Sequence, residues 1–136
     1  MNKEMMRADV SILEFVDDAL AYNGEPFTGI SIEKYHSGNI KQEHSYIDGF
    51  PNGLCRDWYE SGELKSEWIA LRGEAPREVK VWFDNGQIKS KKISEHGVEL
   101  RYEEWDSSGN LICNRELTPD SPMATFLERM RSLKSK

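Results

Sequence analysis

The fold is decided by the stretch Trp58-Tyr59-Glu60-Ser61-Gly62-Glu63-Leu64-Lys65-Ser66-Glu67, because the same pattern recurs on both sides of it. The other copies are Lys34-Tyr35-His36-Ser37-Gly38-Asn39-Ile40-Lys41-Gln42-Glu43, Trp82-Phe83-Asp84-Asn85-Gly86-Gln87-Ile88-Lys89-Ser90-Lys91 and the looser Trp105-Asp106-Ser107-Ser108-Gly109-Asn110-Leu111. The turn glycines Gly38, Gly62, Gly86 and Gly109 are spaced by 24, 24 and 23 positions. A fixed period of this length is typical of a repeat array.

Each copy predicts a β-hairpin. Glycine after a polar residue, between two half-apolar runs, is a strong turn signal because glycine adopts positive φ at low cost. With Ser61-Gly62 at the tip, Tyr59 is expected opposite Leu64. The equivalent pairs are Tyr35 with Ile40, Phe83 with Ile88 and Trp105 with Leu111. These aromatic-aliphatic pairs are predicted to form a ladder on one face of the sheet.

Alternation of side chains along a strand predicts that Trp58 and Trp82 lie on the opposite face. The same reasoning places with them Lys41, Lys65, Lys89, Glu43, Glu67 and Lys91. Further glycine turns at 48–53, 71–76 and 95–97 join successive hairpins. The sequence therefore predicts a mainly β fold, a meander of antiparallel hairpins with a period of about 24 residues.

The repeated pattern Gly-x(3–5)-Trp/Tyr-Tyr/Phe-x-x-Gly-x-Leu/Ile-Lys-x-Glu resembles the variant MORN repeat. The segment 22–29, Tyr-Asn-Gly-Glu-Pro-Phe-Thr-Gly, followed by such repeats, is similar to the opening of the YwqK-type family of bacterial antitoxin and immunity proteins. The resemblance covers residues 20–117, with Arg77 where a unit-opening glycine is expected and a fourth copy without Lys-x-Glu. It implies a non-enzymatic protein that binds and neutralises a cognate bacterial toxin.

The whole chain, residues 1–136, is expected to form one domain. Residues 10–28 form an N-terminal cap and leading strand, with strand favoured at 20–22 by the resemblance. Residues 11–16 fit either a helix or short strands around an Asp17-Asp18 turn, and residues 29–117 form the hairpins. Ser121 as N-cap before Pro122 starts an amphipathic helix over 121–134, interpreted as a cap on the last hairpin or as a partner-binding helix.

The composition of the chain indicates which kinds of partner and which compartment to expect. The net charge of −6 and pI near 5.1 disfavour nonspecific binding to nucleic acid or an anionic membrane and favour a partner with a basic surface. The sequence has neither an apolar run long enough for a membrane span nor a signal-peptide core, which predicts a cytoplasmic protein. Cys55 and Cys113 lie in different repeats and are expected to be reduced thiols.

Catalysis is not predicted. The histidines His36, His44 and His96 have no metal-ligand spacing around them and are interpreted as exposed loop residues. No serine or cysteine has the sequence context of a nucleophile, and no glycines form a phosphate-binding pattern. We therefore expect no catalytic residues, no metal and no cofactor.

Without a predicted catalytic site, the function expected from the sequence is recognition of a partner by surface residues. The residues singled out for it are Trp58, Trp82, Glu99, Glu103, Glu104 and Asp106. Tryptophan is frequent among interface hot spots but also packs thin sheets, and an acidic cluster suits a basic toxin or is a solvated edge. The alternative function is a generic repeat scaffold that binds other proteins or lipid head groups. The toxin, the binding face and the oligomeric state are left open by the sequence.

Overall fold

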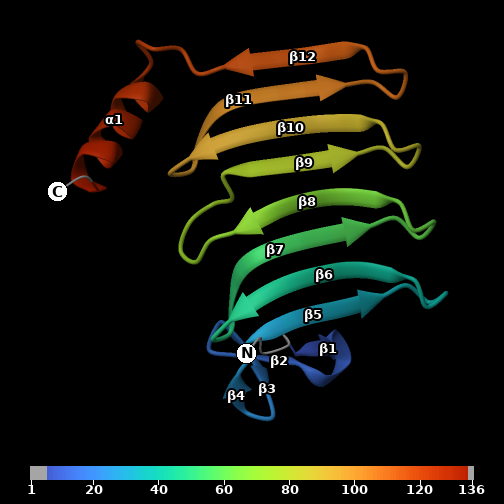
Figure 1. The fold of residues 1–136 in the computed structure, drawn as a ribbon. Coiled ribbons are helices and arrows are strands. Elements are labelled where there is room, and N and C mark those ends of the chain that lie inside the picture. The colour runs from blue at the N-terminus through green and yellow to red at the C-terminus, as the bar shows by residue number, and fades with distance from the viewer. Residues whose placement is uncertain (1–5, 135–136) are drawn as a thin grey trace, which may run out of the picture.

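The computed structural model describes residues 6–134, which form two β-sheets, a 3-10 helix and an α-helix (Figure 1). In chain order the elements are β1 (Arg7–Asp9), η1 (Val10–Ile12), β2 (Glu14–Val16), β3 (Ala19–Tyr22), β4 (Glu25–Pro26), β5 (Gly29–Lys34), β6 (Ile40–Ile47), β7 (Phe50–Trp58), β8 (Leu64–Ala70), β9 (Glu78–Trp82), β10 (Ile88–Glu95), β11 (Val98–Trp105), β12 (Leu111–Glu116) and α1 (Pro122–Lys134). The larger sheet has nine strands, in the order β1-β5-β6-β7-β8-β9-β10-β11-β12, and the smaller has the order β2-β3-β4.

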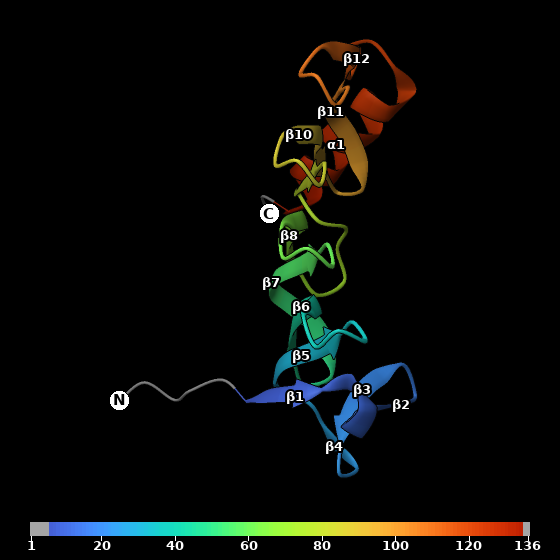
Figure 2. The same ribbon diagram turned by 90° about the vertical axis from the view of Figure 1, so that its right-hand side faces the viewer.

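The predicted meander is confirmed. From β5 to β12, each strand pairs antiparallel with the next strand along the chain. Figures 1 and 2 show a single twisted layer, with the small sheet near one end and α1 near the other. Each hairpin therefore contacts mainly its neighbours, as in other repeat arrays, and both faces of the layer are open to partners.

The four turn glycines close the same kind of loop. In the β7–β8 hairpin, the Gly62 N–H donates to the Tyr59 carbonyl and the Tyr59 N–H donates to the Glu63 carbonyl, each at 2.9 Å. Gly62 has a φ of 99°, in the left-handed region that favours glycine. The loop is thus a type I turn followed by a glycine bulge. Equivalent bonds close the loops at Gly38, Gly86 and Gly109.

This loop corrects the predicted cross-strand pairs. Because Tyr59 is itself the first residue of the turn, Leu64 lies opposite Trp58 rather than opposite Tyr59. The predicted pairs of Tyr35 with Ile40 and of Phe83 with Ile88 are wrong for the same reason, since Lys34 and Trp82 occupy those positions. The pair of Trp105 with Leu111 is confirmed.

A β-bulge beside each turn also changes which face the lysines occupy. Lys65 is an extra residue of β8, because the register shifts between Asp57 and Trp58 on the facing strand. Its ammonium lies 5.6 Å from the centroid of the Tyr59 ring, so lysine and tyrosine share a face. Lys41 and Lys89 lie in the same way over Tyr35 and Phe83. The prediction that these lysines lie beside the tryptophans is therefore wrong.

We name the two faces of the β5–β12 layer by their aromatic residues. The Tyr face carries Tyr35, Tyr59 and Phe83 with Lys41, Lys65 and Lys89. The Trp face carries Trp58, Trp82 and Trp105, opposite Leu64, Ile88 and Leu111 respectively.

The N-terminal segment closes one end of the array. β1 pairs in parallel with β5, and the small sheet packs beside it around a core of Ala8, Leu20 and Phe27. Gly49, between β6 and β7, joins this core to the meander, because its N–H donates to the Phe27 carbonyl and its carbonyl accepts from the Leu20 N–H, both at 2.8 Å. The first edge of the meander is thereby covered, as edge strands require to avoid further pairing.

Residues 11–16, which the sequence left open between a helix and short strands, adopt some of each: residues 11–12 belong to the 3-10 helix η1, and residues 14–16 form β2. The segment leaves η1, enters β2, and reverses at Asp17 and Asp18, whose φ values are 50° and 68°. Positive φ at both central residues is the mark of a type I′ hairpin turn, which aspartate tolerates. The strand predicted at 20–22 is confirmed as part of β3.

The C-terminal helix begins as predicted, but it does not cover the last strand. The Ser121 hydroxyl accepts from the Ala124 N–H at 3.1 Å, and Leu127 is only 2% exposed. Arg131 donates to Glu95 at the end of β10 through Nε, at 2.6 Å, so α1 lies beside the strand ends of β10 and β11 (Figure 1). β12 remains an edge strand, exposed along its length except for a half-buried Cys113.

Candidate partner-binding face

The Trp face repeats one aromatic-aliphatic pair in three successive hairpins. Trp58, Trp82 and Trp105 each stand four residues before their turn glycine and are half-buried. Sequence reasoning grouped Trp105 with the tyrosines, and so missed it as a member of this row. Aligning the copies on position before the glycine is the signal that finds it.

Trp58 is held by an internal hydrogen bond. Its indole Nε1 donates to Glu43 Oε1 at 3.1 Å, across to the preceding hairpin. The other oxygen of Glu43 accepts from Arg7 Nη2 at 2.7 Å, which ties β1 to the same cluster. The ring of Trp58 is therefore fixed over β6, and its donor is already used.

Trp82 and Trp105 are different. Within residues 6–134, neither indole N–H has a hydrogen-bond partner. Both rings are half-buried and neither unpartnered Nε1 is buried, so each tryptophan presents an apolar ring and an available donor at the surface. Tryptophans with these properties are well suited to bind a partner, because the ring excludes water while the N–H selects an acceptor.

The first hairpin lacks a tryptophan and leaves a hollow instead. Lys34 occupies the position that Trp58 has in the next hairpin, four residues before the turn glycine. Between the two hairpins lies an open cavity of about 360 Å³, lined by Gly38, Asn39, Ile40, Glu43, Trp58 and Gly62. The Trp face thus has a cavity between its first two hairpins that a side chain of a partner could fill.

Exposed aliphatic side chains extend the Trp face away from the turns. Leu54 and Ile69 are cross-strand partners, 38% and 51% exposed, and Leu111 is 51% exposed beside Trp105. Exposed apolar groups on one face of a sheet are typical of an interaction surface when they cluster with aromatic anchors.

A row of charged side chains crosses the Trp face from strand to strand. Its members, in spatial order, are Glu43, Arg56, Glu67, Lys80, Lys91 and Glu103. Arg56 donates to Glu67 at 2.7 Å, whereas Lys91 has no ion pair within the part of the chain that the structure describes. The row has three acidic and three basic residues, so it carries no net charge. It is therefore suited to orient a partner on the Trp face rather than to attract one over a distance.

The predicted acidic residues are not gathered into one patch. Glu103 lies on the Trp face, while Glu104, on the opposite face, accepts from the Tyr102 hydroxyl at 2.5 Å. Glu99 binds Arg115, at 3.0 Å between Oε1 and Nη2. Of the four, only Glu103 shares a face with the tryptophans.

Asp106, the remaining acidic residue, closes the last turn. Its Oδ1 accepts from the backbone N–H groups of Ser108 and Asn110, each at 2.9 Å. These bonds hold the pKa of Asp106 below its usual value, with the backbone bond from Asn110 as the largest cause. Asp106 therefore has a structural function, whatever it contacts in a complex.

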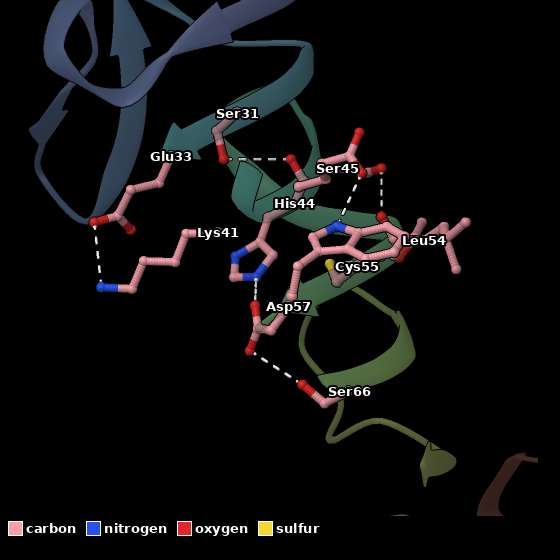
Figure 3. Close-up of polar contacts among 12 residues, drawn as sticks. Ser31, Glu33, Lys41, His44, Ser45, Leu54, Cys55, Asp57 and Ser66 are labelled. Atoms are coloured by element: carbon pink, nitrogen blue, oxygen red, sulfur yellow. Dashed lines mark hydrogen bonds and ion pairs between the residues drawn. The ribbon is translucent and has the colours of Figure 1, made fainter. Parts of the chain in front are cut away.

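The Tyr face carries the most extensive polar network, shown in Figure 3. His44 Nε2 lies 2.8 Å from Asp57 Oδ1, and the Ser66 hydroxyl donates to Asp57 Oδ2 at 3.2 Å. The prediction that all three histidines are exposed in loops is wrong for His44, which is half-buried in β6 and contacts Trp68 edge to face.

This network does not activate a nucleophile. Aspartate stands between the other two residues, so the hydroxyl of Ser66 contacts a carboxylate and has no histidine to accept its proton. The neighbouring Cys55 is a buried free thiol whose pKa is raised chiefly by burial. Across residues 6–134, no three His, Cys, Asp or Glu side chains are grouped so as to hold a metal ion.

Comparison with known proteins agrees with the repeat pattern. The model of the MORN repeat variant matches residues 27–48 and 51–69. The chain is 52% identical over 118 residues to immunity protein YwqK of Bacillus subtilis strain 168, covering 87% of this chain and 77% of that protein. A chain of the GtfA/B complex bound to UDP and GlcNAc is 15% identical, with a TM-score of 0.35, and the match spans 87% of this chain and 30% of that one.

Among the helices that the structure describes, none has the length and apolar character that crossing a bilayer requires.

Proposed function

Because this chain belongs to the family of immunity protein YwqK, with variant MORN repeats, we propose that it neutralises a cognate bacterial toxin by direct protein–protein contact. The observation that carries the proposal is the identity of 52% over 87% of the chain, which extends beyond the two matched repeats. Neutralisation by contact needs a surface rather than a reaction, and the protein acts in the cytoplasm, where it meets the toxin.

The Trp face is the toxin-binding surface in this proposal. Two observations support it: the indole N–H groups of Trp82 and Trp105 are without partners among the described residues, and the aliphatic side chains of Leu54, Ile69 and Leu111 are exposed on the same face. A few aromatic anchors carry most of the affinity of a typical interface, and the surrounding contacts exclude water. Trp58 contributes through shape, since its donor is bound to Glu43.

Charge supports a toxin with a basic surface. The chain has a net charge of −6, and opposite net charges raise the association rate of two proteins. Rapid association matters for an inhibitor that must bind a newly made toxin before it acts. Association should slow as salt screens the two charges.

The proposal is tested by capture followed by rescue. The tagged chain is expressed in the bacterium that encodes it, bound proteins are identified, and the captured protein is then expressed alone or with this chain. We expect one captured protein to arrest growth alone and growth to be restored by co-expression. A captured set without a toxic member, or toxicity that co-expression leaves unchanged, would overturn the proposal.

A pair of matched variants assigns the face in the same assay. Trp82→Ala with Trp105→Ala removes both unpaired anchors and should abolish rescue. Lys65→Gln with Lys89→Gln alters two exposed residues of the Tyr face and should leave rescue intact. Circular dichroism of the purified variants checks that each is folded.

A further inference from the structure

The Tyr face repeats a lysine over an aromatic ring in three successive hairpins. Nζ of Lys41 lies 5.7 Å from the centroid of the Tyr35 ring. The corresponding distances are 5.6 Å for Lys65 over Tyr59 and for Lys89 over Phe83. These distances are within the range of cation–π contacts, so each ammonium lies over the aromatic ring of its own hairpin.

The tyrosine rings under the lysines are themselves fixed. The hydroxyl of Tyr35 donates to the Trp58 carbonyl, and the hydroxyl of Tyr59 donates to the Trp82 carbonyl, both at 2.7 Å. Each ring therefore spans from its own turn to the next hairpin. The result is a row of aromatic platforms near the turn end of the sheet, with one ammonium per hairpin.

The positive charge of this row is largely uncompensated. Lys41 is 3.9 Å from Glu33, an exposed and distant ion pair that Figure 3 shows. Lys65 and Lys89 have no ion pair in the described part of the chain, and both are exposed. In a chain with a net charge of −6, this row is a localised basic strip.

Repeat geometry fixes the spacing of the strip. Equivalent residues of adjacent hairpins are two strands apart, which is about 9.5 Å in a β-sheet. An extended chain advances about 3.3 Å per residue and a polyproline II helix about 3.1 Å, so three residues of either span about one hairpin. A segment that crosses the strands would thus bring every third residue to a lysine.

We propose that this strip binds an acidic, extended segment of a partner protein with a carboxylate at every third residue. The polyproline II form fits best, because its period of three residues, about 9.3 Å, matches the spacing of about 9.5 Å between the lysines of adjacent hairpins. Single-stranded nucleic acid fits less well, because the lysines cover the ring faces on which bases would stack. This inference does not depend on the proposed function, since it concerns the opposite face.

The test uses two synthetic peptides of identical composition. One is a fluorescent peptide with four Glu-Pro-Pro units, and the other carries four Glu followed by eight Pro. Fluorescence anisotropy at low salt measures the affinity of the full chain for each. We expect the periodic peptide to bind at least about tenfold more tightly than the block peptide, since only it brings carboxylates to three lysines together.

Matched variants locate the binding site. Lys65→Gln with Lys89→Gln should reduce affinity for the periodic peptide about tenfold, while Lys80→Gln with Lys91→Gln removes the same charge from the Trp face and should have little effect. Equal affinity for the two peptides, no binding, or equal losses in the two double variants would overturn the proposal. Tighter binding of a poly-dT dodecamer than of the periodic peptide would also overturn it, in favour of nucleic acid.

Discussion

Trp58 and Glu43 are joined by a hydrogen bond of 3.1 Å between two hairpins, whereas the equivalent tryptophans, Trp82 and Trp105, have no such bond in the described residues. The repeat therefore uses the same residue for two purposes. At the N-terminal end the tryptophan locks neighbouring hairpins together, and toward the C-terminal end it is available to a partner.

Replacing tryptophan by phenylalanine separates these two purposes. Trp58→Phe removes a bond to a charged, half-buried acceptor and should lower the free energy of unfolding by about 1 kcal/mol. Trp82→Phe keeps an aromatic ring and loses no hydrogen bond within residues 6–134, so the change should stay within about 0.5 kcal/mol. Urea denaturation of the purified variants measures both, and equal losses would contradict the assignment.

The hydroxyl groups of Tyr35 and Tyr59 each bond to the next hairpin, whereas Phe83, at the equivalent position, has no hydroxyl. This difference gives a second prediction. Tyr59→Phe deletes the bond to the Trp82 carbonyl and should cost about 1 kcal/mol of unfolding free energy. Phe83 holds the equivalent position in the next hairpin, where Phe83→Tyr would direct a hydroxyl toward the Trp105 carbonyl. That substitution should stabilise the protein by about 0.5 kcal/mol in thermal or urea unfolding. A destabilised Phe83→Tyr variant would show that the hairpins are not equivalent there.

Two glycines with similar φ should differ in how well they tolerate alanine. Gly62 has a φ of 99° and open space where the methyl group of alanine would lie, so Gly62→Ala should cost only backbone strain, about 1–2 kcal/mol. At Gly49, with a φ of 86°, that methyl carbon would be 2.8 Å from Ala19 Cβ and 2.9 Å from the Leu20 carbonyl oxygen. Gly49→Ala should therefore destabilise the protein more, and melting midpoints that ranked the two in the opposite order would argue against this packing.

Leu127 is expected to make the largest contribution of helix α1 to stability. Leu127 is 2% exposed, so Leu127→Ala should lower the free energy of unfolding by about 2–4 kcal/mol. Phe126, the adjacent residue, is 44% exposed and provides the control, with an expected loss below about 1 kcal/mol. If chemical denaturation found both losses small, α1 would not be docked on the sheet in solution.

Asp106 gives a pH dependence with a definite sign. Its pKa is lowered in the folded state by hydrogen bonds from the last turn, so the carboxylate stabilises the fold at pH values above its usual 3.8. The stability difference between the wild type and Asp106→Ala should be full near neutral pH and should disappear as the pH falls through the lowered pKa. Unfolding curves between pH 2 and 7, a range of about five units, would show this convergence. A difference that stays constant across the range would contradict the capping function.

The number of hairpins and the positions of their turns could be predicted, because the turns need glycine at positive φ and these glycines recur at regular spacing in the sequence. The register could not, since the same glycine closes loops of different lengths. Whether Tyr59 belongs to the strand or to the turn depends on the loop type. Because Tyr59 lies in the turn, Leu64 is paired with Trp58, and Lys65 lies on the Tyr face instead of the predicted Trp face. Strict alternation fails wherever a bulge adds a residue.

Contacts between residues far apart in the sequence could likewise not be predicted. The N-cap at Ser121 is a local signal and was predicted correctly, but the contact of Arg131 with Glu95, 36 residues away, has no local signal in the sequence. The pairing of His44 with Asp57 needs the β6–β7 register, which no local pattern encodes. Trp58 and Trp82 were correctly predicted to share a face of the sheet, whereas Trp105 was predicted to lie on the other face.

The Trp face is tested most sharply as the toxin-binding surface by the dissociation constant for the captured toxin, measured by isothermal titration calorimetry with the wild type and the two double variants. We expect Trp82→Ala with Trp105→Ala to weaken binding at least about a hundredfold, while Lys65→Gln with Lys89→Gln should change the dissociation constant less than about threefold. An unchanged dissociation constant for the tryptophan variant, or a large loss for the lysine variant instead, would contradict the assignment of the Trp face as the toxin-binding surface.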